Sequence, residues 1–246
     1  MKITKEVYAV GGGRHGFGIS NDYDCNVFLI DGGSELALID AGCGCDVEPI
    51  LGNIRAAGFE PTRVARVLLT HAHADHCGAS AALRERLGLE VALSRHEADF
   101  LERGDEAAVS LDRARAEGIY PADYRLKPCT VDRRLSHGDE VACGPLVIRA
   151  IEVEGHSLGS ICYLVSGGER ICLFSGDTVF PPGTISLLNC EGSSLAGYRR
   201  DIHRLANLGI EALLPGHGGF CLTGGQRHID EAIRALASIW PPKNFL

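Results

Sequence analysis

Four side chains of types that commonly bind metal ions occur within six residues of one another, directly after the apolar run 64–69. They are His71, His73, Asp75 and His76. An alanine-rich helical pattern follows, so the order predicts a buried strand, a loop and a helix. In an extended segment His71, His73 and Asp75 project to one side of the backbone, whereas His76 needs a sharp turn or a second metal ion. This density of ligands favours a zinc or iron site over a polar loop that is merely rich in histidine.

Three more potential ligands lie downstream, each directly after a glycine. They are His156, Asp177 and His217. Together with the H-x-H-x-D-H pattern of residues 71–76, they resemble, in order, the metal-binding blocks of the metallo-β-lactamase superfamily of hydrolases. The blocks span most of the chain. The resemblance implies an α/β fold, a four-layer αβ/βα sandwich of two mixed sheets with helices outside, formed by residues 1–246 as one domain.

The resemblance also implies how two divalent metal ions would share these ligands. The first ion would be held by His71, His73 and His156, the second by Asp75, His76 and His217, and Asp177 would bridge both. Zinc is the expected metal, and iron or manganese accept the same ligands. Two such ions ~3.5–4 Å apart share a water molecule and deprotonate it near neutral pH. The resulting hydroxide would attack the carbonyl of an ester, thioester or lactone, with Asp75 as the catalytic carboxylate that orients it.

Asp177 indicates which members of the superfamily the chain resembles most. True metallo-β-lactamases generally lack this bridging aspartate, so the chain is more similar to glyoxalase II and the acyl-homoserine lactonases. Phe180 stands where the lactonases usually have a tyrosine, and the glycine-cysteine-glycine-arginine signature of glyoxalase II is absent. Only residues 218–246 follow the last ligand, which is short for the glutathione-binding region of glyoxalase II. The sequence therefore predicts a hydrolase without naming its substrate.

Two other activities stay open on the same ligands. A mononuclear iron enzyme resembling the persulfide dioxygenases would use only His71, His156 and Asp177. A phosphodiesterase would use the two-metal site on a different bond. The net charge of −8 and the lack of a basic cluster argue against nucleic acid, so the expected partner is a small-molecule substrate.

Composition and termini predict a cytoplasmic protein. No apolar stretch approaches the ~18 residues that a membrane span needs, so no membrane partner is expected. The segment 1–6 lacks an apolar signal sequence, and the ten cysteines are therefore expected as free thiols in a reducing compartment. Among them, Cys77 is expected to support or pack near the site. A homodimer would be compatible with the sequence, which does not define the oligomeric state.

Other segments are expected to surround the site. Residues 95–128 are charged and partly helical in pattern, which predicts a helical insertion over the site that sets substrate choice, or else a solvated flank. By resemblance, Asp40 at the end of a predicted strand would lie beneath the metal ions. The glycine-rich loop 11–18 is expected at the mouth of the site, with His15 and Phe17 exposed to solvent or, alternatively, in contact with the substrate. A later helix is predicted over 195–208, with Ser193 or Ser194 as its N-cap.

Overall fold

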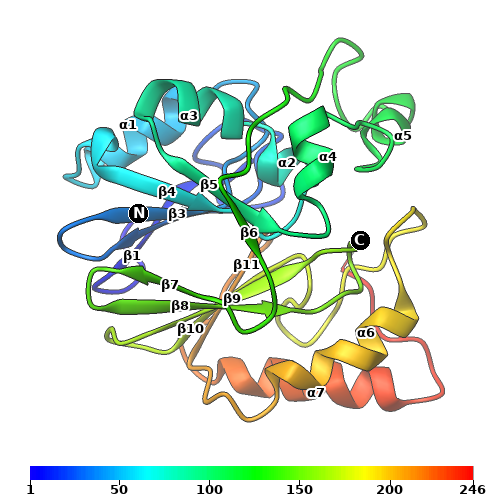
Figure 1. Cartoon of the computed structure of the whole chain (residues 1–246). Coiled ribbons are helices and arrows are strands. Elements are labelled where there is room, and N and C mark those ends of the chain that lie inside the picture. The colour runs from blue at the N-terminus through cyan, green and yellow to red at the C-terminus, as the bar shows by residue number, and fades with distance from the viewer. Residues whose placement is uncertain (246) are drawn as a thin grey trace.

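Two β-sheets pack face to face between two layers of helices in the computed structural model, which describes residues 1–245 (Figure 1). The strands of the first sheet lie side by side in chain order: β1 (Val7–Gly11), β2 (Val27–Asp31), β3 (Leu36–Ile39), β4 (Val64–Leu68), β5 (Glu90–Ser94) and β6 (Arg133–Leu135). Those of the second sheet lie in the order β11 (Ala212–Pro215), β10 (Cys172–Gly176), β9 (Ile161–Ser166), β8 (Leu146–Glu152) and β7 (Glu140–Cys143). These layers confirm the predicted αβ/βα sandwich.

Both sheets are mixed. In the first, β1 to β3 are antiparallel to their neighbours and β3 to β6 are parallel. In the second, β7 to β10 are antiparallel and β11 is added parallel to β10. Parallel neighbours need a crossover connection, and these connections carry α1 (Glu48–Ala56), α3 (Ser80–Leu87) and α6 (Leu195–Asp201), whereas α7 (Gly225–Ala237) follows the last strand. Because β9 is antiparallel to both β8 and β10, and β11 is parallel to β10, the strands β8, β10 and β11 run in the same direction and their carboxyl ends lie on the same side of the sheet.

Helices cover the outer face of each sheet (Figure 1). Over the first sheet lie α1 and α3, and over the second lie α6 and α7. The shorter helices are η1 (Pro61–Arg63), α2 (Ala74–Cys77), α4 (Ala98–Arg103), α5 (Leu111–Ala116) and η2 (Ile202–Leu205). The helix predicted over 195–208 is therefore divided, because its second half winds as the 3₁₀ helix η2. Its N-cap is as predicted, since the Ser194 side chain accepts a hydrogen bond from the Gly197 N–H.

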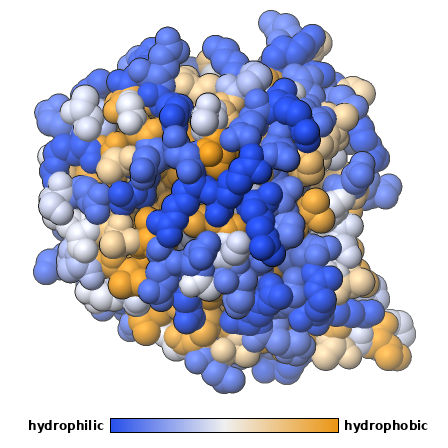
Figure 2. All heavy atoms as spheres, viewed as in Figure 1, coloured by the Kyte–Doolittle hydropathy of each residue, from blue (hydrophilic) through white to orange (hydrophobic). Residues whose placement is uncertain are grey.

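Three apolar clusters hold the layers together, one under each helix layer and one between the sheets. Between the sheets, Phe28 and Phe174 meet edge to face with ring centroids 5.2 Å apart. Phe17, expected on an exposed loop, packs edge to face on Phe28 instead. Figure 2 shows a mainly hydrophilic surface on the face viewed, with hydrophobic residues in separate small patches. Among the helices of residues 1–245, none has the length and apolar character to cross a bilayer.

The segment 95–128 is less helical than predicted. It contains only the six-residue helices α4 and α5, and the remainder is irregular. Its apolar side chains join the cluster under the first sheet, among them Leu101, Leu111 and Leu126. These residues pack the segment onto the sandwich, while much of its remaining surface is exposed.

Candidate metal centre

The motif of residues 71–76 leaves the end of β4 as a short loop and closes into the single turn of α2. His73 has extended backbone dihedrals and precedes α2, whereas Asp75 and His76 lie within that helical turn. The expected extended row of three ligands therefore holds only for His71 and His73. The helical turn changes the direction of the Asp75 side chain. It also brings His76, which does not fit the alternating pattern, next to Asp75 and His217.

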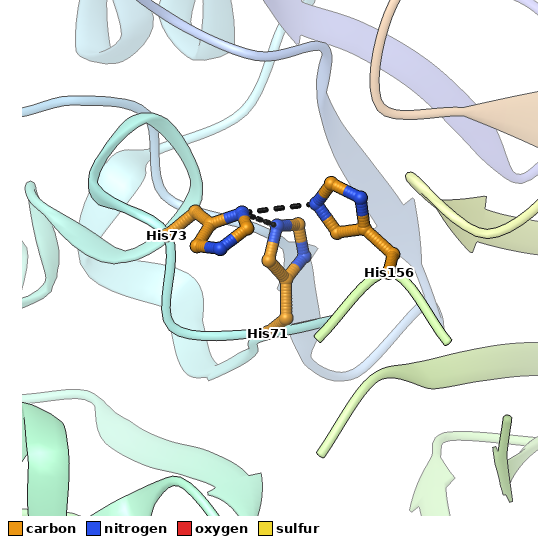
Figure 3. Close-up of side chains that lie close together, drawn as sticks. All are labelled: His71, His73 and His156. Atoms are coloured by element: carbon orange, nitrogen blue, oxygen red, sulfur yellow. Dashed lines mark hydrogen bonds between the residues drawn. The ribbon is translucent and has the colours of Figure 1, made fainter. Parts of the chain in front are cut away.

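The first group of ligands joins the two halves of the chain. His73 Nδ1 lies 3.1 Å from His71 Nε2 and 2.9 Å from His156 Nε2 (Figure 3). His156 comes from the loop after β8, far from the other two in sequence. Three imidazole nitrogens that converge this closely suit the nitrogen donor set that zinc prefers. These three residues are called the first triad below.

The second group consists of Asp75, His76 and His217 and is called the second triad below. Asp75 Oδ2 lies 3.0 Å from His217 Nε2 and 3.7 Å from His76 Nε2. His217 directly follows Gly216 at the end of β11, so this triad also combines ligands from both sheets. One carboxylate and two imidazoles form a donor set common to zinc, iron and manganese.

Asp177 lies between the two triads. Its Oδ2 is 3.7 Å from His156 Nε2 in the first triad and 3.5 Å from His217 Nε2 in the second. Its Oδ1 is 3.4 Å from His76 Nε2. The structure therefore brings together all seven residues that the sequence singled out, with this carboxylate in contact range of both groups.

Buried atoms without partners support a fit to metal ions. Within the described chain, His76 Nε2 and Asp177 Oδ1 are buried and have no hydrogen-bond partner. Buried polar atoms in proteins are almost always paired, so these two point to a ligand that completes them. Both atoms face the space between the triads, where a cation would satisfy an imidazole nitrogen and a carboxylate oxygen together.

A network behind the second triad fixes its orientation. Asp40 Oδ2 accepts a hydrogen bond of 2.8 Å from His76 Nδ1, and Asp40 Oδ1 accepts one of 2.7 Å from the Thr70 backbone N–H. This contact turns Nε2 of His76 toward the carboxylates of Asp75 and Asp177. Asp40 has a left-handed backbone with φ of 61°, which aspartate and asparagine tolerate better than most residues. Its place beneath the ligands agrees with the prediction.

His156 of the first triad is oriented in a comparable way. Its Nδ1 donates to the backbone carbonyl of Ser186 at 2.9 Å, which leaves Nε2 free to bind a cation. Cys77 is buried beside this triad and donates from Sγ to the carbonyl of Ala72 at 3.2 Å. Its contact is with the ligand loop, as expected for a supporting residue.

Burial and neighbouring charges shift the pKa values of the ligands in different ways. Burial lowers the pKa of His73 to about 3 and, together with neighbouring histidines, holds the pKa of His71 well below its usual value. Both rings are therefore neutral, as metal ligands must be. Burial would raise the pKa of Asp75, but His76 and His217 hold it below its usual range. Burial would likewise raise the pKa of Asp177, but the same two histidines lower it, so both carboxyl groups stay ionised.

A cavity of about 290 Å³ opens in front of the ligands. Its walls include His73, Asp75, His156, Asp177 and His217. The segment 95–128 contributes Val109, Leu111, Ala114, Ile119 and Tyr120, and His15 lines the same cavity from the glycine-rich loop. Part of the segment 95–128 therefore lies beside the ligands.

Two residues of this segment were missed by sequence analysis. Tyr120 faces the ligands, and burial, with the Asp75 carboxylate adding to the effect, raises the pKa of its phenol well above the usual value. Glu97 is buried behind the first triad and accepts hydrogen bonds from its loops. Neither residue belongs to a recognisable motif, and only the packing of 95–128 against the site reveals them.

Comparisons with known proteins agree with this geometry. A family model described as the metallo-beta-lactamase superfamily matches residues 20–217. The acyl-coenzyme A thioesterase MBLAC2 of Gallus gallus is 32% identical over 219 residues, which cover 82% of this chain and 74% of that protein. A hydroxyacylglutathione hydrolase of Bradyrhizobium sp. (strain BTAi1 / ATCC BAA-1182) is 29% identical over 135 residues, which cover 55% of this chain and 40% of that protein.

Solved structures share the fold. A metallo-β-lactamase variant from Cronobacter sakazakii superposes with a TM-score of 0.74 at 22% identity, covering 96% of this chain and 94% of that one. A B3 metallo-β-lactamase with an active-site glutamic acid gives a TM-score of 0.70 at 24% identity, covering 94% of this chain and 86% of that one. At these identities the likeness concerns the arrangement of the two sheets and their helices.

Replacing Asp40 tests the support of the second triad. Asp40→Asn keeps a residue that tolerates the left-handed backbone, but sets an amide NH₂ or a weaker acceptor against His76 Nδ1. We expect the affinity of the second triad for a divalent ion to fall about 10- to 100-fold, with a smaller change at the first triad. Competition with a chromophoric chelator measures both affinities.

Asp31→Asn is the matched control, because Asp31 accepts a hydrogen bond from the Gly33 N–H in a turn that does not touch the ligands. Unchanged affinity in Asp40→Asn would contradict the role assigned to Asp40.

Proposed function

Because this chain belongs to the metallo-β-lactamase superfamily and is a metal-dependent hydrolase, we propose that it cleaves thioesters with a pair of metal ions. The observation that carries the dinuclear part of the proposal is the position of Asp177 between two complete triads. The thioester part is supported by the relatives named as an acyl-coenzyme A thioesterase and a hydroxyacylglutathione hydrolase. Simple esters and lactones share the same electrophilic carbonyl and are the neighbouring candidates.

The roles of the ligands follow from their geometry. We propose that the first triad would hold one ion and the second triad the other, with Asp177, whose Oδ2 lies near His156 and His217, as the ligand that both ions would share. When bound, the ions supply an activated water and a Lewis acid for the carbonyl oxygen. Zinc is the proposed metal because it accepts both imidazole nitrogen and carboxylate oxygen in four-coordinate sites.

Asp75 is proposed to handle the proton of the attacking water. Its carboxylate lines the cavity and offers oxygens that accept hydrogen bonds. It therefore accepts a hydrogen bond from the water and orients it toward the carbonyl carbon. Asp75 takes up the proton that the water loses as it attacks and passes it to the thiolate that leaves when the carbon–sulfur bond breaks.

Tyr120 is proposed to donate a hydrogen bond to the oxygen of the substrate carbonyl. Its raised pKa keeps the phenol protonated, and it reaches the cavity from the segment 95–128. Phe180, at the position where lactonases usually have a tyrosine, is buried and stacks on Phe245 with ring centroids 4.0 Å apart. A phenol from a different segment therefore supplies the donor that Phe180 lacks.

The cavity walls support a substrate with an apolar acyl group. Val109, Leu111, Ile119, Leu188 and Phe245 line the cavity around the ligands. Burial of such a group against these side chains gains roughly 0.8 kcal/mol per methylene. We propose that the acyl chain lies against these residues while the thioester carbonyl faces Asp75 and Tyr120.

The other expectations become part of the proposal. Residues 1–246 are proposed to form one catalytic domain, with 95–128 as the insertion that selects the substrate. A small molecule, without nucleic acid or membrane, is the proposed partner, and a homodimer is compatible with this arrangement. All ten cysteines are unpaired, which supports a cytoplasmic location with free thiols.

The mononuclear iron alternative uses fewer of the observed contacts. It would engage His71, His156 and Asp177 but would give no role to the convergence of Asp75 and His217 at 3.0 Å. The two-metal proposal gives every one of these side chains a ligand role.

Thiol release from acyl thioesters tests the proposed reaction. The zinc-loaded protein is expected to hydrolyse acetyl and octanoyl thioesters of a simple thiol, and chelation is expected to abolish turnover until zinc is restored. Asp75→Asn is expected to lower kcat by at least about 100-fold, because it removes both the proton acceptor and a ligand of the second triad. A metal-loaded protein that releases no thiol from either thioester, but cleaves a lactone or a phosphodiester, would contradict the thioester assignment.

The acyl-binding wall predicts chain-length selectivity. Ala114 lies on α5 and lines the cavity, whereas Ala116 on the same helix is exposed. Ala114→Trp is expected to lower kcat/KM for the octanoyl thioester about 10-fold and to leave the acetyl thioester nearly unchanged, because the indole fills space that only the longer chain needs. Ala116→Trp is the matched control. Equal losses on both substrates in Ala114→Trp would contradict the placement of the acyl chain.

A further inference from the structure

Glu97 is a buried acid that no motif includes. It follows β5, directly precedes α4 and is only 3% exposed. Ionisable side chains are almost never this buried unless they are paired. Its side chain makes no capping bond to α4, the helix that begins at the next residue. The carboxylate is therefore not used for local structure.

Both carboxylate oxygens bind the loops that carry the first triad. Oε2 accepts a hydrogen bond of 2.7 Å from the backbone N–H of Ala72, the residue between His71 and His73. Oε1 accepts one of 2.8 Å from the backbone N–H of Gly159, three residues after His156. One side chain thus connects the two chain segments whose histidines must meet at one ion.

The backbone at Gly159 lies too close to Ser94 and Glu97 to carry a side chain. A Cβ atom at position 159 would lie 2.6 Å from Ser94 Oγ and 2.9 Å from Glu97 Cγ. Only glycine permits the His156 loop to approach the acid this closely. The loop is also held by its own hydroxyls, since Ser157 and Ser160 are 2.8 Å apart at Oγ.

From these contacts we infer that Glu97 is a positioning residue that sets the distance between His156 and the pair His71 and His73. Its carboxylate hydrogen-bonds to backbone N–H groups on both sides of the first triad and acts through them. It also links the base of the insertion 95–128 to the first triad. The inference rests on the proposed function only in that the first triad holds a metal ion.

A carboxylate suits this position better than an amide. Ionised glutamate presents two acceptor oxygens, and both are occupied by N–H donors here. A glutamine would present one acceptor and one NH₂, so one of the two backbone N–H groups would face a donor. Burial raises the pKa of the Glu97 carboxyl, while hydrogen bonds from Ser157, Gly159 and Ala72 favour its charged form.

Metal affinity of Glu97→Gln tests the inference. Removing a hydrogen-bonding group behind a metal ligand typically lowers affinity about 10- to 100-fold. We expect the first triad to lose affinity for Co²⁺ or Zn²⁺ within this range, while the second triad changes less. Co²⁺ absorption and chelator competition report both affinities without any substrate. Glu97→Ala is expected to lose at least as much.

Glu102→Gln is the matched control. Glu102 lies on α4, and its Oε1 accepts a hydrogen bond of 3.2 Å from the backbone N–H of Val131, away from the ligands. This variant is expected to bind metal as the unmodified protein does.

Two results would overturn the inference. One is a Glu97→Gln protein that binds metal at the first triad with unchanged affinity. The other is a lower thermal midpoint of the metal-free protein with no change in affinity, which would make Glu97 a structural residue only. Failure of the proposed function is distinguished by measurements on the unmodified protein. That protein would bind fewer than two metal ions per chain or release no thiol from thioesters, whatever the effect of Glu97→Gln.

Discussion

The position of Asp177 between two groups of imidazoles is the constraint on which the site depends. Seven polar side chains are gathered where the two sheets meet, and burying polar groups without partners costs free energy. Within the described chain, His76 Nε2 and Asp177 Oδ1 are two such buried atoms without a hydrogen-bond partner. Cations between the triads would satisfy both atoms, so metal binding and folding stability are expected to be coupled.

The scaffold holds each triad from behind with a carboxylate. Asp40, at the end of β3, orients His76 and the Thr70 backbone behind the second triad. Glu97, at the start of the insertion, holds the two loops of the first. The two acids come from different elements and act differently, one on a ligand ring and the other on the ligand backbone. Ligand geometry is thus supported by residues outside the metal-binding motif.

Much of the site was predictable because its chemistry is local in sequence. The cluster of residues 71–76 and the glycine-preceded ligands at 156, 177 and 217 carry a recognisable pattern, and the sandwich follows from the resemblance. The turn of α2 was not predictable, because the pattern of alternate residues does not reveal that Asp75 and His76 become helical. The roles of Glu97 and Tyr120 depend on how an irregular segment packs, and neither periodicity nor spacing encodes that. Phe17 was misplaced for the same reason, since only tertiary packing brings this glycine-loop aromatic, partly buried, against Phe28.

Metal content per chain tests the central claim most directly. It would be measured by elemental analysis on protein purified without added metal, and again after reconstitution with zinc, alongside Asp177→Ala. The two-metal account predicts two ions per reconstituted chain, falling to one or none in Asp177→Ala, because the variant loses the ligand that both ions share. A single iron per chain that is retained in both His76→Ala and His217→Ala would contradict the account and favour the mononuclear alternative.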